Sequence, residues 1–305
     1  MTGDNPEYAV PLQNLRRVVL LGKANCDGPT LYQLSGKGIP VDWLTIMGLP
    51  HAQLLPLDRH CDAALYAQTE FCHGAHALPI ARRLILAKVN NCREILRRRT
   101  ADHTGWLPRL KGIDNADNLE SLRGHEGEAA RFYFSHWSGL TGDLPWHGRH
   151  ARPAPDPVNA MLNLGYTLLR NRLASAIRHA GLNPRLGIFH IGRGGHTALA
   201  SDLMEPLRAV VDNCVLTLSA KRQFKQEDFI IKGKACICAP EGAFSSLLTE
   251  YEKMFERKHT FYYSNAEPQK RTLNDIMDDL AESFALCCHD RHGLAIPELA
   301  PCPPI

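Results

Sequence analysis

Hydrophobic positions follow two different periods along the chain. Residues 9 to about 65 contain short apolar runs, such as Val18–Leu21, and Gly or Pro interrupts them about every ten residues. This spacing is typical of short β-strands joined by turns, and residues 30–34 favour one or two helical turns between them. The first part of the chain is therefore predicted to be a small β-rich domain, residues 1–68.

From about residue 66 the apolar positions recur at helical spacing. Long helices are predicted over residues 78–99 and about 156–180, the second with one apolar stripe through Leu162, Tyr166, Leu169 and Leu173. Further helices are expected over about 198–214, 241–257 and 271–288, with a strand pair around 229–239. The predicted fold class is α+β: the β-rich domain is followed by a larger all-α catalytic domain, residues 69–305.

Composition sets limits on the class of protein. A chain of 305 residues with 44% hydrophobic and 22% charged residues is typical of an ordinary soluble protein, and no apolar run is long enough to predict a membrane span. The ten cysteines form no CxxC pair, which favours reduced thiols and a cytoplasmic location. The net charge is only +3, so a polyanionic partner would have to be bound by local basic patches.

Residues 181–208 combine a histidine with two acids. Asp202 and Glu205 are spaced i, i+3 in a predicted helix and are expected to share one face. Neighbouring carboxylates repel each other, and a divalent cation removes that cost. Together with His190 they would suit Mg²⁺ or Mn²⁺. A solvated helix in which Glu205 pairs with Arg208 explains the same residue types.

A third acid lies upstream, between two glycines. Glu126 follows Gly124, precedes Gly127 and is predicted to open a helix. A carboxylate in a first helical turn is often only favourable for the helix dipole, but flanking glycines allow close approach of another element or a ligand. The helix over residues 78–99 is rich in arginine, which predicts either a solvated face or a phosphate-contacting surface.

Three motifs occur in one order along the chain: Gly124-His-Glu-Gly127, Asp156-Pro-Val-Asn-Ala-Met-Leu-Asn-Leu-Gly-Tyr166, and residues 181–208 with their Asp-Leu-Met-Glu-Pro-Leu-Arg segment. Together they resemble the CRISPR-associated spacer integrases, the Cas-one family. The resemblance covers essentially the whole chain, since the segment from Pro11 to Gly22 fits the family's β domain and Lys88-Val-Asn-Asn fits its first long catalytic helix.

The resemblance implies a metal site whose ligands are also the catalytic residues. The family's catalytic and metal-binding residues would fall on Glu126, His190, Asp202 and Glu205. His196 is a rival for the histidine, but Gly187-Ile-Phe-His190 matches the family's G-[IF]-x-H segment. Glu126→Ala or Asp202→Ala is expected to abolish strand transfer without unfolding the protein. Removal of one carboxylate should leave the thermal midpoint nearly unchanged or raised without metal, because like-charge repulsion falls.

The implied activity is that of a divalent-metal-dependent DNA endonuclease and integrase of CRISPR antiviral defence. The 3′-hydroxyl of a spacer DNA would attack a phosphate at the end of a CRISPR repeat by transesterification. The implied partners are a second copy of the chain, a Cas-two dimer and double-stranded DNA. Only ten residues precede Pro11, so we also expect either a lost first hairpin or a fused or associated reverse transcriptase upstream.

DNA affinity is predicted to come from basic residues that contact phosphates. The six candidates are Arg82, Lys88, Arg97, Arg149, Arg152 and Lys221. Tyr166 is expected to pack in the core rather than line the site, and Asp212 to pair with Arg208 rather than bind metal.

Two other functions remain open at this point. A transposon-borne integrase relative would use the same fold to insert the ends of its own element. A non-catalytic DNA-binding scaffold in the adaptation complex would not need competent residues at all four metal positions, which this chain has.

Overall fold

The computed structural model describes residues 10–15, 17–45, 50–55, 62–100, 104–150, 152–191, 196–239, 243–263, 267–290 and 294–299. The chain divides into two compact units, residues 1–61 and 62–305. The predicted class, a small β-rich unit followed by a larger, mainly helical one, is confirmed. The division falls at 61/62 rather than at the predicted 68/69, because helix α2 (Asp62–His73) belongs to the second unit.

The first unit is a three-stranded sheet with one crossover helix. Strand β1 (Val18–Leu21) pairs in parallel with β2 (Val41–Leu44), which pairs antiparallel with β3 (Pro50–Leu54). Consecutive parallel strands need a crossover, and α1 (Gly28–Gly36) supplies it. The sequence pattern predicted the helix but not β3.

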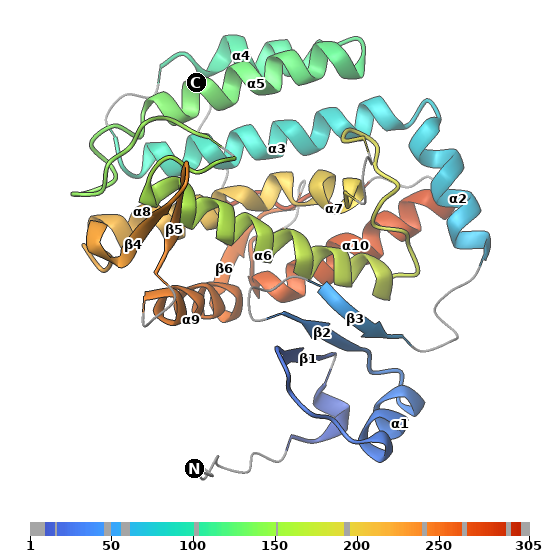
Figure 1. Ribbon diagram of the computed structural model, residues 1–305. Helices are drawn as coiled ribbons and strands as arrows, with labels where there is room; N and C mark the ends of the chain where they lie inside the picture. Colours follow the sequence, from blue (N-terminus) through green and yellow to red (C-terminus); the bar gives the residue numbers. More distant parts are fainter. Residues whose placement is uncertain are drawn as a thin grey trace, which may run out of the picture. The chain divides into compact units, whose positions relative to one another are not determined.

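The second unit consists of helices with two hairpins (Figure 1). Its helices after α2 are α3 (Ala77–Arg97), α4 (Trp106–Asp114), α5 (Leu119–Ser135), α6 (Pro157–His179), α7 (Ala198–Leu203), α8 (Arg208–Ala220), α9 (Ala243–Glu256) and α10 (Leu273–Asp290). None of these described helices combines the length and the apolar character needed to cross a membrane.

Helix α3 is the central element of the second unit. It packs against α4 and α5 on one side and against α7, α8 and the turn between them on the other, an arrangement that can be followed in Figure 1. Its apolar stripe, which includes Leu84, Ile95 and Leu96, is buried as the helical pattern predicted. Residues on α3 can therefore face α5 and the turn after α7 at the same time.

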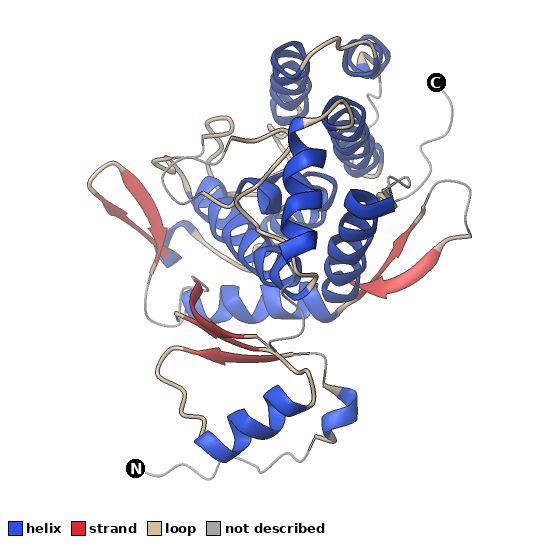
Figure 2. Ribbon diagram, turned by 90° about the vertical axis from the view of Figure 1, so that its right-hand side faces the viewer, coloured by secondary structure: helices blue, strands red, loops and turns tan. Residues whose placement is uncertain are grey.

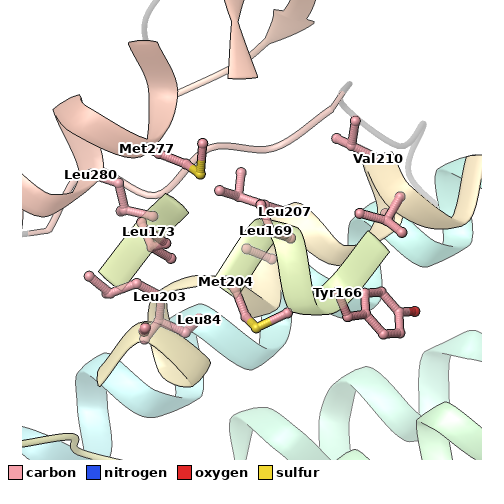
Figure 3. Close-up of a cluster of buried hydrophobic side chains, with 14 of the residues drawn as sticks. Leu84, Tyr166, Leu169, Leu173, Leu203, Met204, Leu207, Val210, Met277 and Leu280 are labelled. Carbon is pink, nitrogen blue, oxygen red and sulfur yellow. The ribbon is translucent and has the colours of Figure 1, made fainter. Parts of the chain in front are cut away.

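Helix α6 supplies much of the core. The predicted stripe through Leu162, Tyr166, Leu169 and Leu173 is buried. Asp156 caps the helix, because its side chain accepts a hydrogen bond from the Asn159 N–H at 2.8 Å. Figure 3 shows side chains of α3, α6, α7, α8 and α10 meeting in one apolar cluster, with Tyr166 at its edge and its hydroxyl directed away from the leucines.

The predicted continuous helix over 198–214 is broken in the structure. Helix α7 ends at Leu203, a 3₁₀ turn covers Glu205–Leu207, and α8 begins at Arg208. Pro206 explains the break, since it has no N–H to donate and its ring would clash with the carbonyl one turn earlier. The two acids therefore lie in different elements, not on one helical face as predicted.

The helical unit also contains short strands. The predicted pair around 229–239 is present as β4 (Phe229–Lys232) and β5 (Ala235–Cys238). A second hairpin, β6 (Lys258–Phe261) with β7 (Gln269–Thr272), was not predicted. Figure 2 shows the two hairpins at opposite edges of this unit, so the part of the chain predicted to be all-α is mainly rather than purely α-helical.

Candidate active site

Asp202 is the most completely bonded acid in this region. Its Oδ2 accepts the main-chain N–H groups of Ile188 at 2.6 Å and Phe189 at 3.1 Å. Its Oδ1 accepts the main-chain N–H of His190 at 2.8 Å and faces the Nδ1 atom of the same residue at 2.7 Å. The side chain is 1% exposed. Asp202 therefore fixes the shape of the segment that carries His190.

The tautomer of His190 follows from this contact. Three main-chain N–H groups already donate to the Asp202 carboxylate, which acts as the acceptor toward the ring as well, so the Nδ1 atom of His190 carries the proton. In the neutral ring the Nε2 atom then keeps its lone pair, and it lies 3.9 Å from Glu205 Oε1. Burial works against the charged ring, but the hydrogen bond to Asp202 and the charge of Glu205 raise the pKa of His190 overall.

Gly187 allows the loop to approach Asp202. A Cβ atom at this position would lie 2.6 Å from Asp202 Oδ2 and 2.9 Å from the backbone of Ala198. Only glycine fits this contact without displacement of the chain. The glycine of the predicted Gly187-Ile-Phe-His190 motif thus has a packing reason.

Glu205 faces a different direction from Asp202. It lies in the 3₁₀ turn, is 2% exposed, and its Oε1 accepts from Arg208 Nε at 3.0 Å. Burial opposes ionisation, but the positive charges of Arg208 and Lys88 lower the pKa of Glu205 to about 2. Glu205 is therefore a buried carboxylate that stays charged.

Glu126 reaches the same region from helix α5. The helix begins at Leu119, where the Asn118 side chain caps it, so Glu126 is in its middle and does not open it as predicted. The reason is that the asparagine cap, eight positions upstream, starts the helix, and the two glycines lie within it. Glu126 remains partly accessible, with 23% of its side chain exposed.

Lys88 joins the two glutamates. Its ammonium nitrogen lies 2.5 Å from Glu126 Oε1 and 2.6 Å from Glu205 Oε2. The side chain is 13% exposed, and burial disfavours its charge, yet the two carboxylates raise its pKa well above the usual value. Lys88, predicted as a phosphate contact, is thus held by acids in this structure.

These side chains surround one pocket of about 310 Å³. Its lining combines charged or titratable side chains with aromatic ones, namely Lys88, Glu126, His190, Glu205, Arg208, Trp106, Tyr133, Phe134 and Tyr166. Asp202 does not line it. Three of the four predicted site residues therefore meet at the pocket, and the fourth lies behind His190.

A third acid lines the pocket beside Tyr166. Asp212 is buried and accepts a hydrogen bond from the Tyr166 hydroxyl. Burial raises the pKa of its carboxyl to about 6, although the Tyr166 hydrogen bond and the charge of Arg208 oppose the rise. The predicted Asp212–Arg208 pair is replaced by this contact, because Arg208 binds Glu205 and stacks 4.6 Å over the Tyr166 ring. Tyr166 packs in the core, as expected, and also lines the pocket.

His196, the rival histidine, does not reach the glutamates. Its Nε2 atom lies 3.1 Å from the Ser201 hydroxyl, and its ring centre is 6.3 Å from that of His190. Burial and the charge of Arg170 lower the pKa of His196. The structure therefore brings His190 rather than His196 to the pocket.

The six predicted phosphate contacts have different surroundings. Arg149 lines the pocket but is bonded to the side chains of Asn159 at 3.0 Å and Asn163 at 2.8 Å. Arg97 is bonded to the buried Glu94. Lys88 is held by the two glutamates, as described above. Of the remaining three candidates, Arg152 and Lys221 are exposed and Arg82 is partly buried.

The donor set fits a divalent ion chemically, although the atoms do not yet converge. Glu205 Oε2 is buried and receives no well-directed hydrogen bond, despite the nearby ammonium of Lys88. An imidazole nitrogen with a free lone pair and two carboxylates suits Mn²⁺ or Mg²⁺. Within the described residues, no three His, Cys, Asp or Glu side chains are close enough to hold a metal ion, and Lys88 occupies the space between the glutamates.

Similarity to known proteins decides the family. The family model described as CRISPR associated protein Cas1 matches residues 2–253. The chain belongs to the Cas1 family. The predicted resemblance to the Cas-one family is thereby confirmed. Relatives include CRISPR-associated endonuclease Cas1 1 of Thermus thermophilus, 37% identical over 68% of this chain and 65% of its own length. CRISPR-associated endonuclease Cas1 1 of Chlorobaculum tepidum is 31% identical over 83% of this chain and 80% of its own.

Solved structures show the same fold at low identity. A casposase bound to integration product has a TM-score of 0.74 at 22% identity and covers 97% of this Cas1 chain and 90% of its own. A partial Cas6-RT-Cas1–Cas2 complex has a TM-score of 0.75 at 23% identity and covers 93% of this chain and 87% of its own. The chain spans less than two thirds of the length of the first curated relatives that it matches, 65% and 61%.

Proposed function

We propose that this Cas1 chain is a divalent-metal-dependent DNA integrase and endonuclease of CRISPR adaptation. It would join the 3′-hydroxyl ends of spacer DNA to the ends of a CRISPR repeat. The observation that carries the proposal is the meeting of Glu126, His190 and Glu205 at one pocket in a Cas1 fold. Relatives named CRISPR-associated endonucleases support the nuclease part, and the casposase neighbour supports an integrase fold.

We assign the metal-binding role to Glu126, His190 and Glu205, and a positioning role to Asp202. This revises the ligand set expected from the sequence, because both oxygens of Asp202 are already bonded to N–H groups. Bound Mg²⁺ or Mn²⁺ would polarise the phosphoryl oxygen and lower the pKa of the attacking hydroxyl.

The other pocket residues orient these groups and supply positive charge. Asp202 keeps the proton on His190 Nδ1 and so leaves Nε2 as the donor atom. Arg208 fixes Glu205 through its Nε atom. The guanidinium groups of Arg149 and Arg208 line the pocket and can stabilise the charge of a phosphodiester in its transition state.

The reaction is an exchange of one phosphodiester for another. A 3′-hydroxyl loses its proton and bonds to phosphorus, and the P–O bond to the repeat strand's 3′-oxygen breaks. That oxygen takes a proton and becomes a new 3′-hydroxyl, so no external energy source is needed. With water as the nucleophile, the same site would hydrolyse DNA, which explains an endonuclease activity.

The proposed partners are a second copy of the chain, a Cas2 dimer and double-stranded DNA. The partial complex of Cas6-RT-Cas1 with Cas2 supports a Cas2 partner and, for some relatives, a reverse transcriptase. An activity on chromosomal DNA would place the protein in the cytoplasm.

A second candidate is an integrase that inserts its own element ends. The likeness to a casposase bound to integration product favours keeping it. A non-catalytic scaffold is less well supported, because Lys88 and Arg208 stabilise two buried or half-buried carboxylates that a scaffold would not need.

Strand transfer into a plasmid tests the proposal. A labelled short DNA duplex is incubated with Cas2 and with plasmids that carry or lack a CRISPR repeat, with and without Mn²⁺. Glu126→Gln should abolish joining, whereas Glu120→Gln, an exposed glutamate on the same helix, should retain it. Equal joining to plasmids with and without the repeat would favour the element-end integrase. Neither joining nor cleavage by the native chain would favour the scaffold.

A further inference from the structure

We propose that Lys88 is an exchangeable internal cation: its ammonium neutralises Glu126 and Glu205 until a divalent ion takes its place. The inference rests on the proposed metal site. The ammonium nitrogen of Lys88 lies 2.5 Å from Glu126 Oε1, on α5, and 2.6 Å from Glu205 Oε2, in the turn after α7. These are the two oxygens that a bridging metal ion would use.

The ammonium and the metal ion cannot occupy this place together. Mg²⁺ bound by the same two oxygens would lie about 2.1 Å from each, within the space that the nitrogen of Lys88 fills. Two cations at such a separation repel strongly, and the repulsion is greater in a pocket than in water. Binding of the ion therefore requires the ammonium to move away from both carboxylates.

Lys88 is the cation that can move, and Arg208 is the one that stays. The lysine ends a flexible four-carbon stem and holds the acids only through its ammonium. The guanidinium of Arg208 donates to the opposite oxygen, Glu205 Oε1, and stacks over the Tyr166 ring. Its charge therefore continues to stabilise Glu205 after Lys88 has left.

Lys88 should consequently compete with the metal ion. Lys88→Met keeps an unbranched side chain of similar length and removes the charge. In calorimetric titrations this variant should bind Mn²⁺ at least tenfold more tightly than the native chain. Its unfolding temperature without metal should be lower, and the rise on addition of Mn²⁺ larger.

Lys253→Met is the matched control. This lysine pairs with Glu250 at 2.8 Å but is exposed and lies outside the pocket. Its removal should leave the Mn²⁺ affinity unchanged. Equal or weaker Mn²⁺ binding by a folded Lys88→Met variant would overturn the exchange.

A second measurement uses the native chain and does not depend on the variant's folding. Acetylation of lysines with a limited amount of reagent, read by peptide mass spectrometry, should become faster at Lys88 when Mn²⁺ is added, with Lys253 as the internal reference. Binding of Mn²⁺ without a change at Lys88 refutes the exchange alone. No Mn²⁺ binding by the native chain refutes the metal site and the exchange together.

Discussion

Replacing Asp202 by asparagine should separate its role from that of Glu126. From the sequence alone, either acid is expected to be removable without loss of stability. The structure changes that expectation for Asp202, because each of its oxygens faces two N–H groups. Asparagine has nearly the same shape but carries an amide NH₂ in place of one oxygen.

The size of the effect follows from the number of lost bonds. Whichever way the amide turns, two N–H donors face another donor. Hydrogen bonds to charged groups contribute about 1.5–3 kcal/mol each, so Asp202→Asn should lower the free energy of unfolding by about 3–6 kcal/mol. For a domain of this size, that corresponds to a fall of about 6–24 °C in the unfolding temperature.

Glu126→Gln provides the comparison. Glu126 is partly exposed and Lys88 keeps Glu205 as a partner, so the expected loss is below about 1 kcal/mol. Thermal and urea unfolding, followed by circular dichroism at the helix band without divalent ions, measures both variants. We expect both to lose strand transfer. If Asp202→Asn unfolds like the native chain, its carboxylate does not organise the His190 segment and the positioning role is refuted.

Three further predictions concern the pocket and its surroundings. The folded chain should bind a proton at Asp212 more tightly than the unfolded chain, because burial raises its pKa to about 6, so stability should fall as the pH rises from about 4 to about 6. Asp212→Asn should remove up to about 3 kcal/mol of that fall in urea titrations at each pH, and an identical fall would contradict the assignment. Gly187→Ala should lower the unfolding temperature and strand transfer together, since its Cβ meets Asp202 Oδ2 at 2.6 Å, whereas a fully active variant would show that the loop adapts. Arg152→Ala, at an exposed position, should weaken DNA binding and reduce the salt slope by about one unit in anisotropy titrations without loss of stability. Arg149→Ala should also destabilise the fold, because Arg149 is partly buried and bonded to two asparagine side chains.

Local signals predicted those parts of the fold that depend on neighbouring residues. The predicted helix from about residue 156, its apolar stripe and the strand pair around 229–239 are all present. Each of these features is decided by a few adjacent side chains. The second hairpin, β6 with β7, and strand β3 were missed, because their short segments carry no clear alternation of apolar and polar residues.

The start of α5 shows how a local rule can fail. Glycine before Glu126 suggested a helix boundary, but Asn118 caps the helix earlier. A cap satisfies N–H groups that would otherwise lack partners, whereas a glycine within a helix costs only about 1 kcal/mol relative to alanine. Asn118 was therefore a stronger signal for the start of the helix than the glycines that flank Glu126.

The two acids of residues 181–208 were predicted to act as a pair, and the structure gives them different partners. Pro206 ends the helix between them, and long-range contacts then decide what each carboxylate meets. Asp202 meets N–H groups of residues 188–190, and Glu205 meets Lys88 on another helix. Spacing in sequence cannot distinguish an acid that accepts hydrogen bonds from the backbone from one that faces a cation. Pro206 is part of the Asp-Leu-Met-Glu-Pro-Leu-Arg segment, and a helix break between Asp202 and Arg208 could have been inferred from it.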